Sequence, residues 1–242
     1  MDDLTPRQTE ILKTIIAQYT DKGEAVGSEI LDKKYNLGVS PATIRNEMVE
    51  LSKKGYLKKE HFSSGRVPTA KAFRFYINNI MQEKELSTTD EVSYKNDVWD
   101  HKHDLSELLQ TATRVLARRT GLLAVTTTDR GDIYYFGINN LLANREFQDI
   151  AEARLIFSRF DESAFCASVL QELARIENEL LFMFEEQDTK SISASVFGEF
   201  KGKNISGAIG VMGPRRMRYD VVVPSVRYFT NLINTIVEQE GL

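Results

Sequence analysis

Residues 40–53 offer hydrogen-bonding, cationic and small apolar side chains at helical spacing. Ser40-Pro41 predicts a helix start, because serine caps a helix N-terminus and proline suits the first helical position. Ile44, Met48 and Leu51 follow at i, i+4 and i+7, which places them on one buried stripe. The outward face and its flanks then carry Ala42, Thr43, Arg45, Asn46, Val49 and Lys53.

Side chains of these types suit the major groove of double-stranded DNA. The Asn46 amide can hydrogen-bond adenine through two atoms, and Arg45 can bind guanine or phosphate. Small apolar residues such as Ala42 and Val49 can contact the methyl group of thymine. A well-capped surface helix is the alternative interpretation, and this segment alone does not separate the two.

A short hairpin is predicted directly after this helix. Tyr56–Lys59 and Arg66–Pro68 can pair as strands, closed by Phe62-Ser63-Ser64-Gly65. A turn rich in serine and glycine lets the backbone approach a phosphate, and basic side chains there can neutralise phosphate or enter a minor groove. Lysines would also suit an ordinary solvent-exposed hairpin, but its position after the helix favours a wing that contacts DNA. The residues concerned are Lys58, Lys59, His61, Ser63, Ser64, Gly65 and Arg66.

Two further helices are predicted ahead of residue 40. Thr5-Pro6-Arg7-Gln8 is a capping box for the first, which ends near Asp21-Lys22-Gly23. Gly27-Ser28 starts the second, which runs to about Tyr35 and is expected to bury Ile30 and Leu31. With residues 36–39 as the turn, this is helix-turn-helix order. Residues 1–70 are therefore predicted to form a winged helix-turn-helix unit that binds DNA.

The charge distribution supports a nucleic-acid partner for this part of the chain only. The net charge is −4 over 242 residues. Residues 33–80 contain 10 Lys or Arg against 3 Asp or Glu, a balance of +7, whereas residues 81–242 contain 18 against 25, a balance of −7. Phosphate is attracted to the first stretch. Lysines that merely solubilise a helical surface are the alternative explanation.

Composition argues against several other classes of protein. No uninterrupted apolar run approaches the roughly 18 residues of a membrane helix. Met1-Asp2-Asp3 does not resemble a secretion signal, so we expect a cytoplasmic protein without a membrane partner. Cys166 is the only cysteine, which excludes an internal disulfide and a thiolate metal cluster within one chain.

The remaining residues are predicted to form a connector and an α+β domain. Residues 71–104 comprise most of a helix expected over 69–84 and a polar linker at 85–100. Residues 105–242 then interleave helices with strands. The helices are expected at 105–116, 146–160, 162–175 and 225–240, and the strands at 122–127, 133–138, 178–184, 192–200 and 206–212.

This second half offers little for catalysis. His101 and His103 stand in a polar stretch without nearby thiolates, which favours a surface linker over a metal site. The glycines at 207, 210 and 213 fit no phosphate-binding loop and are expected to permit close backbone packing. Cys166 is expected to be a buried, inert thiol. Arg215, Arg216 and Arg218 are interpreted as surface arginines, and we assign no catalytic residue, cofactor or metal.

Several of these segments together resemble the HrcA family of heat-inducible transcription repressors. The matching motifs lie at Ser40–Met48, Gly55–Leu57, His61–Thr69, Phe73–Tyr76, Gly137–Leu142 and Gly207–Met217, so the resemblance runs nearly end to end. It implies a winged helix-turn-helix followed by a GAF-like domain. That domain is reduced here, because the strands and inserted dimerisation domain of the family are missing between Thr128 and Gly131. Phe62, Ser64 and Ala72 also depart from the family's usual threonine, alanine and glycine.

The resemblance implies a repressor of chaperone operons that binds an inverted-repeat operator of the CIRCE type as a dimer, with the chaperonin as a modulator. Two copies related by a two-fold axis read an inverted repeat most economically. One alternative is a metabolite-responsive regulator that uses the GAF-like domain as a ligand sensor, which a deep polar pocket would favour. Another is an interaction protein without operator specificity, which equal binding to random DNA would favour.

Overall fold

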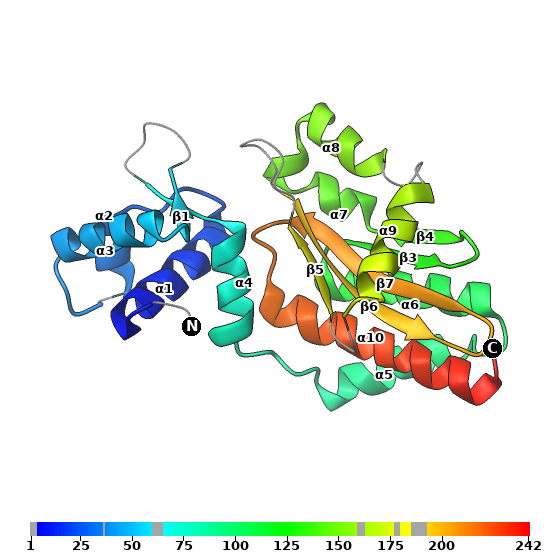
Figure 1. Cartoon of the computed structure of the whole chain (residues 1–242). Coiled ribbons are helices and arrows are strands. Elements are labelled where there is room, and N and C mark those ends of the chain that lie inside the picture. The colour runs from blue at the N-terminus through cyan, green and yellow to red at the C-terminus, as the bar shows by residue number, and fades with distance from the viewer. Residues whose placement is uncertain (1–3, 36, 60–64, 159–162, 177–179, 185–192) are drawn as a thin grey trace. The chain divides into compact units, whose positions relative to one another are not determined.

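The computed structural model describes the chain except residues 1–3, 36, 60–64, 159–162, 177–179 and 185–192 (Figure 1). Two compact units are present. Unit 1 is Met1–Gln82 with Arg216–Arg218, and unit 2 is Glu83–Arg215 with Tyr219–Leu242. Helices combine with an antiparallel sheet, so the chain is of the α+β class.

Unit 1 begins with three helices that start at the predicted caps. The elements are α1 (Pro6–Lys22), α2 (Ser28–Tyr35), α3 (Pro41–Lys53), β1 (Leu57–Lys58), β2 (Val67–Pro68) and α4 (Ala70–Asn79). The Thr5 hydroxyl accepts a hydrogen bond from the Gln8 N–H at 3.2 Å, and the Gln8 side chain accepts one from the Thr5 N–H at 3.3 Å. Ser40 likewise accepts from the Thr43 N–H at 3.2 Å. The predicted capping box and the predicted start of α3 are both confirmed.

The buried faces of these helices form the core of unit 1, with one correction to the expected pattern. Leu31 is fully buried, but Ile30, which was expected beside it, is 41% exposed. Adjacent residues of a helix point about 100° apart, and in α2 the side that faces the core carries Leu31, which leaves Ile30 toward solvent. The core includes Ile11, Leu12, Ile15, Ile16, Leu31, Ile44, Met48 and Leu51.

The strands after α3 pair as predicted and gain a partner that the sequence did not reveal. Leu57 pairs with Pro68 and Lys58 with Val67 in antiparallel register. Val26, between α1 and α2, exchanges backbone hydrogen bonds with Arg66: its N–H donates at 2.8 Å and its carbonyl oxygen accepts at 2.9 Å. The segment before α2 is therefore fastened to the base of the hairpin.

Helix α4 closes unit 1 and ends earlier than expected, at Asn79 instead of residue 84. Phe73 is fully buried, and the ring of Phe75 contacts that of Tyr56 edge-on, with 5.5 Å between ring centroids. Unit 1 also contains Arg216, whose Nη1 donates to the Thr20 carbonyl oxygen at 3.2 Å. That bond places a cation at the C-terminal end of α1, where helix carbonyl groups lack intrahelical donors.

Unit 2 is built on a five-stranded antiparallel sheet in the order β4-β3-β7-β6-β5 (Figure 1). The strands are β3 (Leu123–Thr128), β4 (Ile133–Phe136), β5 (Leu181–Phe184), β6 (Ser193–Lys201) and β7 (Ser206–Pro214). Strands β3 and β4 are joined by a tight turn, in which the Thr128 N–H donates to the Asp132 carbonyl oxygen at 3.1 Å and Gly131 has a φ of 87°. A left-handed backbone of this kind suits glycine.

Helices cover both faces of this sheet, and Figure 1 shows α6 and α10 on the opposite side from α7, α8 and α9. The helices are α5 (Thr88–Trp99), α6 (Leu105–Thr120), α7 (Ile138–Leu142), α8 (Ile150–Phe157), α9 (Ser163–Leu173) and α10 (Tyr219–Glu240), with a 3-10 turn η1 (Arg145–Phe147). Alternate strand residues point to opposite faces. Leu123, Val125 and Phe197 join a cluster with Val169 of α9, whereas Thr126 hydrogen-bonds Thr113 of α6 at 2.6 Å.

The polar stretch 85–100, predicted as a linker, instead contains helix α5. Ser87 caps it by accepting from the Asp90 N–H at 3.1 Å. Its apolar stripe is thin, and tertiary contacts hold it: the Tyr94 ring lies 5.7 Å from that of Phe229, and the Tyr228 hydroxyl donates to the Glu91 carbonyl oxygen at 2.7 Å. Burial, aided by the Glu91 carboxylate, raises the pKa of Tyr228, which keeps this hydroxyl a donor.

The other boundary errors also have local causes. Helix α10 starts at Tyr219, not at 225, and contains Pro224, which has no N–H for the Asp220 carbonyl oxygen. That oxygen instead accepts from the Lys84 N–H at 2.8 Å. The helix expected from 146 begins at Ile150 after η1, and β4 ends at Phe136 because Gly137, at φ 93°, starts α7.

Candidate nucleic-acid interface

The outward face of α3 is exposed where the sequence predicts it. Ala42, Arg45, Asn46, Val49 and Lys53 are all exposed, and Thr43 is half-buried. The inward stripe of Ile44, Met48 and Leu51 is buried. Polar and small apolar side chains capable of base contacts thus line one solvent-facing side of a rigid helix.

Cations in unit 1 fall into paired and unpaired sets. Lys53 forms an ion pair with Glu50 at 2.7 Å, and Lys54 donates to the Gln8 side chain at 2.9 Å. Among the described residues, no ion pair or side-chain hydrogen bond involves Arg45, Lys58 or Lys59. These three cations remain available for an anionic partner, whereas Lys53 must first break its ion pair with Glu50.

Arg66 is held at the junction of the hairpin and α3. Its Nε donates to the Ser52 hydroxyl at 3.2 Å, and its Nη1 donates to the Gly65 carbonyl oxygen at 3.3 Å. Ser52 in turn donates to the Met48 carbonyl oxygen at 2.8 Å. Together with the backbone bonds to Val26, these contacts fix the guanidinium of Arg66 relative to α3.

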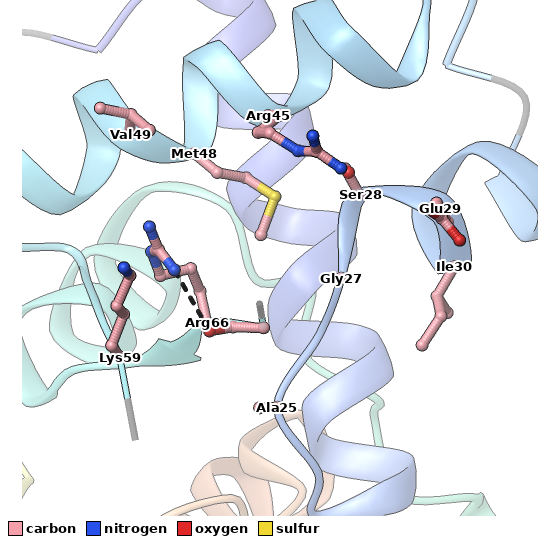
Figure 2. Close-up of a pocket in the computed structure, with 11 residues that line it drawn as sticks. Ala25, Gly27, Ser28, Glu29, Ile30, Arg45, Met48, Val49, Lys59 and Arg66 are labelled. Atoms are coloured by element: carbon pink, nitrogen blue, oxygen red, sulfur yellow. Dashed lines mark hydrogen bonds between the residues drawn. The ribbon is translucent and has the colours of Figure 1, made fainter. Parts of the chain in front are cut away.

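A groove of about 660 Å³ lies between the start of α2, α3 and the hairpin (Figure 2). Of the predicted site residues, the structure brings Arg45, Val49, Lys59, Gly65 and Arg66 together along it. Figure 2 shows Arg45 reaching toward Ser28 at the start of α2, with Lys59 and Arg66 beside each other across the groove and Met48 between the two sides.

Sequence reasoning missed the wall that α2 contributes. Ser28 and Ile30 line the groove but were assigned only to a cap and to the core. No local signal in the sequence distinguishes Ile30 from Leu31, because neighbouring apolar residues such as Ile11 and Leu12 are both buried in α1. Gly65 lines the groove because it packs against Ala25: a Cβ on Gly65 would lie 2.8 Å from the Ala25 Cβ.

The other predicted site residues are not in the groove or fall outside the described part of the chain. Ser40, Ala42, Thr43, Asn46, Lys53 and Lys58 belong to α3, its cap or β1 and do not line the groove. His61, Ser63 and Ser64 lie outside the described residues.

The residues of the second half take mainly structural positions. Cys166 is buried, as predicted. The three glycines of β7 lie in close packing, as predicted: Cβ atoms on them would meet Phe200, the Val196 carbonyl oxygen and Leu122 at 2.3, 2.2 and 2.7 Å. The two histidines pair with acids, His101 with Glu107 at 3.0 Å and His103 with Glu240 at 2.9 Å. Arg215 is a correction, since it is buried instead of on the surface.

The groove and the exposed α3 face define a candidate surface for an anionic, groove-bearing partner. A family profile described as "HrcA protein C terminal domain" matches residues 42–223. The chain therefore belongs to the HrcA family. Within the described residues, no helix is long and apolar enough to cross a membrane.

Relatives of known name agree with this assignment. The heat-inducible transcription repressor HrcA of Syntrophobacter fumaroxidans is 25% identical over 346 aligned positions, covering 100% of this chain and 99% of the relative. Those of Roseiflexus castenholzii and Clostridioides difficile are 39% and 36% identical over 128 and 126 residues, or 53% and 52% of this chain. These two matches span only 36% and 37% of the relatives' own lengths.

The alignment with the Syntrophobacter fumaroxidans repressor also shows that this chain is shorter than its relative. Its 346 positions exceed the 242 residues of this chain, so at least 104 positions have no counterpart here. A solved structure described only as a hypothetical protein at 2.2 Å resolution superposes with a TM-score of 0.78 at 16% identity, covering 98% of this chain and 100% of its own. That likeness concerns the fold alone.

Proposed function

We propose that this chain is a transcription repressor that binds DNA through residues 1–70, acting as a winged helix-turn-helix. The observation that carries the proposal is the exposed face of α3, which presents Asn46 and Arg45 to solvent, with Arg45 lining the same groove as the hairpin cations Lys59 and Arg66. Asparagine is the side chain that most often reads adenine in the major groove, and arginine binds guanine or phosphate. The excess of positive charge over residues 33–80 supplies the sequence-independent part of the affinity.

The target we propose is an inverted-repeat operator of the CIRCE type ahead of chaperone operons, bound by a homodimer. The names of the relatives, all heat-inducible transcription repressors, support this choice. A two-fold dimer presents two copies of α3 to two half-sites. The chaperonin is the proposed modulator of repression, as the family resemblance implies.

Residues 105–242 are proposed as a GAF-like regulatory and dimerisation domain, connected through residues 71–104. The ligand-sensor alternative would require a polar pocket in this part. The described core beside the sheet is instead filled by apolar side chains such as Leu123, Phe197 and Met212. Apolar packing of this cluster is the observation that we set against a polar ligand site there.

The test compares binding of the purified protein to an inverted-repeat duplex and to a scrambled duplex of the same length. Asn46→Ala is expected to weaken binding to the inverted repeat by about 1–3 kcal/mol and to spare the scrambled duplex. Fluorescence anisotropy at fixed salt measures both affinities. Equal losses on the two duplexes would remove Asn46 from base recognition, and equal wild-type affinities would contradict the operator. Footprinting on the promoters of the protein's own genome then identifies the regulated genes.

A further inference from the structure

We propose that the groove between α2, α3 and the hairpin seats the sugar-phosphate backbone of one DNA strand, with Arg45 on one phosphate and Lys59 and Arg66 on another. This inference rests on the proposed function and names the part of the DNA that the groove holds. It assigns Arg45 to phosphate, a choice that the residue type alone leaves open between guanine and phosphate.

The charge of the groove favours an anion. Three cations, Arg45, Lys59 and Arg66, line it against one carboxylate, that of Glu29, so the lining carries a balance of +2. Arg45 and Lys59 have no partner among the described residues. Like charges gathered in one concave surface repel each other, and a bound phosphate removes that repulsion.

The shape of the groove separates the cations into two places. Arg45 reaches toward Ser28 on one side, and Lys59 and Arg66 lie together on the other (Figure 2). Between them stands Met48, which is 3% exposed, and the rim carries Val49 and Ile30, which are 37% and 41% exposed. Cations accompanied by the exposed apolar side chains of Val49 and Ile30 match a DNA strand, in which apolar sugar edges alternate with phosphates.

One further feature fits a phosphate at each place. Ser28 begins α2, an eight-residue helix, and first-turn N–H groups carry partial positive charge. Arg66 cannot swing away freely, because Ser52 and the Val26 backbone hold it. The groove therefore presents Arg66 in a fixed position, which lowers the entropic cost of binding at that residue.

Asn46, which is proposed to recognise bases, provides a contrast to phosphate binding by Arg45. It is exposed on the next position of α3 but does not line the groove. On this geometry, Asn46 determines which sequence is bound, and Arg45 determines how strongly any sequence is bound. The two adjacent residues should therefore respond differently to a change of DNA sequence.

The experiment measures the salt dependence of binding to a random-sequence duplex and to the inverted repeat for Arg45→Ala, Lys59→Ala and Arg45→Lys. Each alanine variant is expected to reduce the slope of log K against log salt by about 1 on both duplexes and to leave their affinity ratio unchanged. Arg45→Lys is expected to keep the slope. Lys33→Ala is the matched control, because Lys33 is exposed in the last turn of α2 and does not line the groove.

The outcomes separate this inference from the proposed function. An Arg45→Ala variant that weakens only the inverted repeat would overturn the phosphate assignment while leaving a sequence-specific repressor. An unchanged slope on random DNA, or a loss as large in Lys33→Ala, would overturn the groove as a binding site. A reduced slope in a protein that binds both duplexes equally would support the groove and contradict the operator. Circular dichroism of each variant checks that it is folded.

Discussion

The Arg66 Nε donates to the Ser52 hydroxyl at 3.2 Å, which joins the base of the hairpin to the last turn of α3. Ser52 also donates to the Met48 carbonyl oxygen, so its hydroxyl is both donor and acceptor. This hydrogen bond holds Arg66 of the proposed wing at a fixed position relative to α3, the helix proposed to read DNA.

Replacing Ser52 tests that relation without changing any charge. Ser52→Ala is expected to weaken binding to every duplex by about 0.5–1.5 kcal/mol, since Arg66 loses one fixing hydrogen bond, and to keep the salt slope. Anisotropy titrations over a range of salt concentrations measure both quantities. A double-mutant cycle with Arg66→Ala should be non-additive. Additive losses would show that Ser52 does not act through Arg66.

Lys58 tests the outer strand of the hairpin. It is half-buried on β1, pairs with Val67 through the backbone, and has no ion pair among the described residues. Lys58→Ala is expected to weaken all sequences alike and to reduce the salt slope by about 1, because one phosphate contact is lost. Lys33→Ala again serves as the control. A slope equal to that of the wild type would place the Lys58 side chain outside the interface.

Gly210 tests the packing of the central strand β7 between β3 and β6. A Cβ at this position would stand 2.2 Å from the Val196 carbonyl oxygen and 2.8 Å from the Phe197 Cα, which are backbone atoms that cannot turn aside. Gly210→Ala is expected to lower the free energy of unfolding by about 1–3 kcal/mol or more. Gly27→Ala, with nothing within 4 Å of its Cβ, is the neutral control. Chemical denaturation measures both, and equal stability of the two variants would contradict the packing argument.

The mode of dimerisation gives the last prediction. Phe75 of α4 and Ile80, which follows this helix, are apolar residues that could pair two copies, but Phe75 is already buried against Tyr56 within unit 1. Phe75→Ala is therefore expected to lower the unfolding free energy by about 3–5 kcal/mol without changing the association constant. The free protein is expected to form a weak dimer that DNA strengthens. Two copies bound to adjacent half-sites raise the effective concentration of residues 105–242 of one copy for those of the other.

Sedimentation across concentrations, with and without the inverted repeat, measures that association. A monomer on the full repeat, with half-sites filled independently, would contradict the dimer. A Phe75→Ala variant that remains stable but dissociates would place Phe75 between copies instead of within unit 1.

Local patterns were enough to predict most of unit 1. Capping residues at Thr5 and Ser40, the apolar stripe of α3 and the pairing of Lys58 with Val67 all depend on residues close in sequence. The exposed face of α3 follows directly from that stripe, since the side opposite a buried stripe faces solvent. The burial of Cys166 and the close packing of the β7 glycines were predictable from their apolar surroundings.

Contacts between distant segments decided the rest. Helix α5 has too thin an apolar stripe to be recognised and is held by Phe229 and Tyr228, far along the chain. Pro224 remains inside α10 because Lys84 satisfies the carbonyl group that proline leaves free. The groove itself arises because Val26 and Ser52 bind Arg66 and bring α2, α3 and the hairpin together. Periodicity reports which side of an element is buried, but only the folded chain determines which exposed side chains face one another.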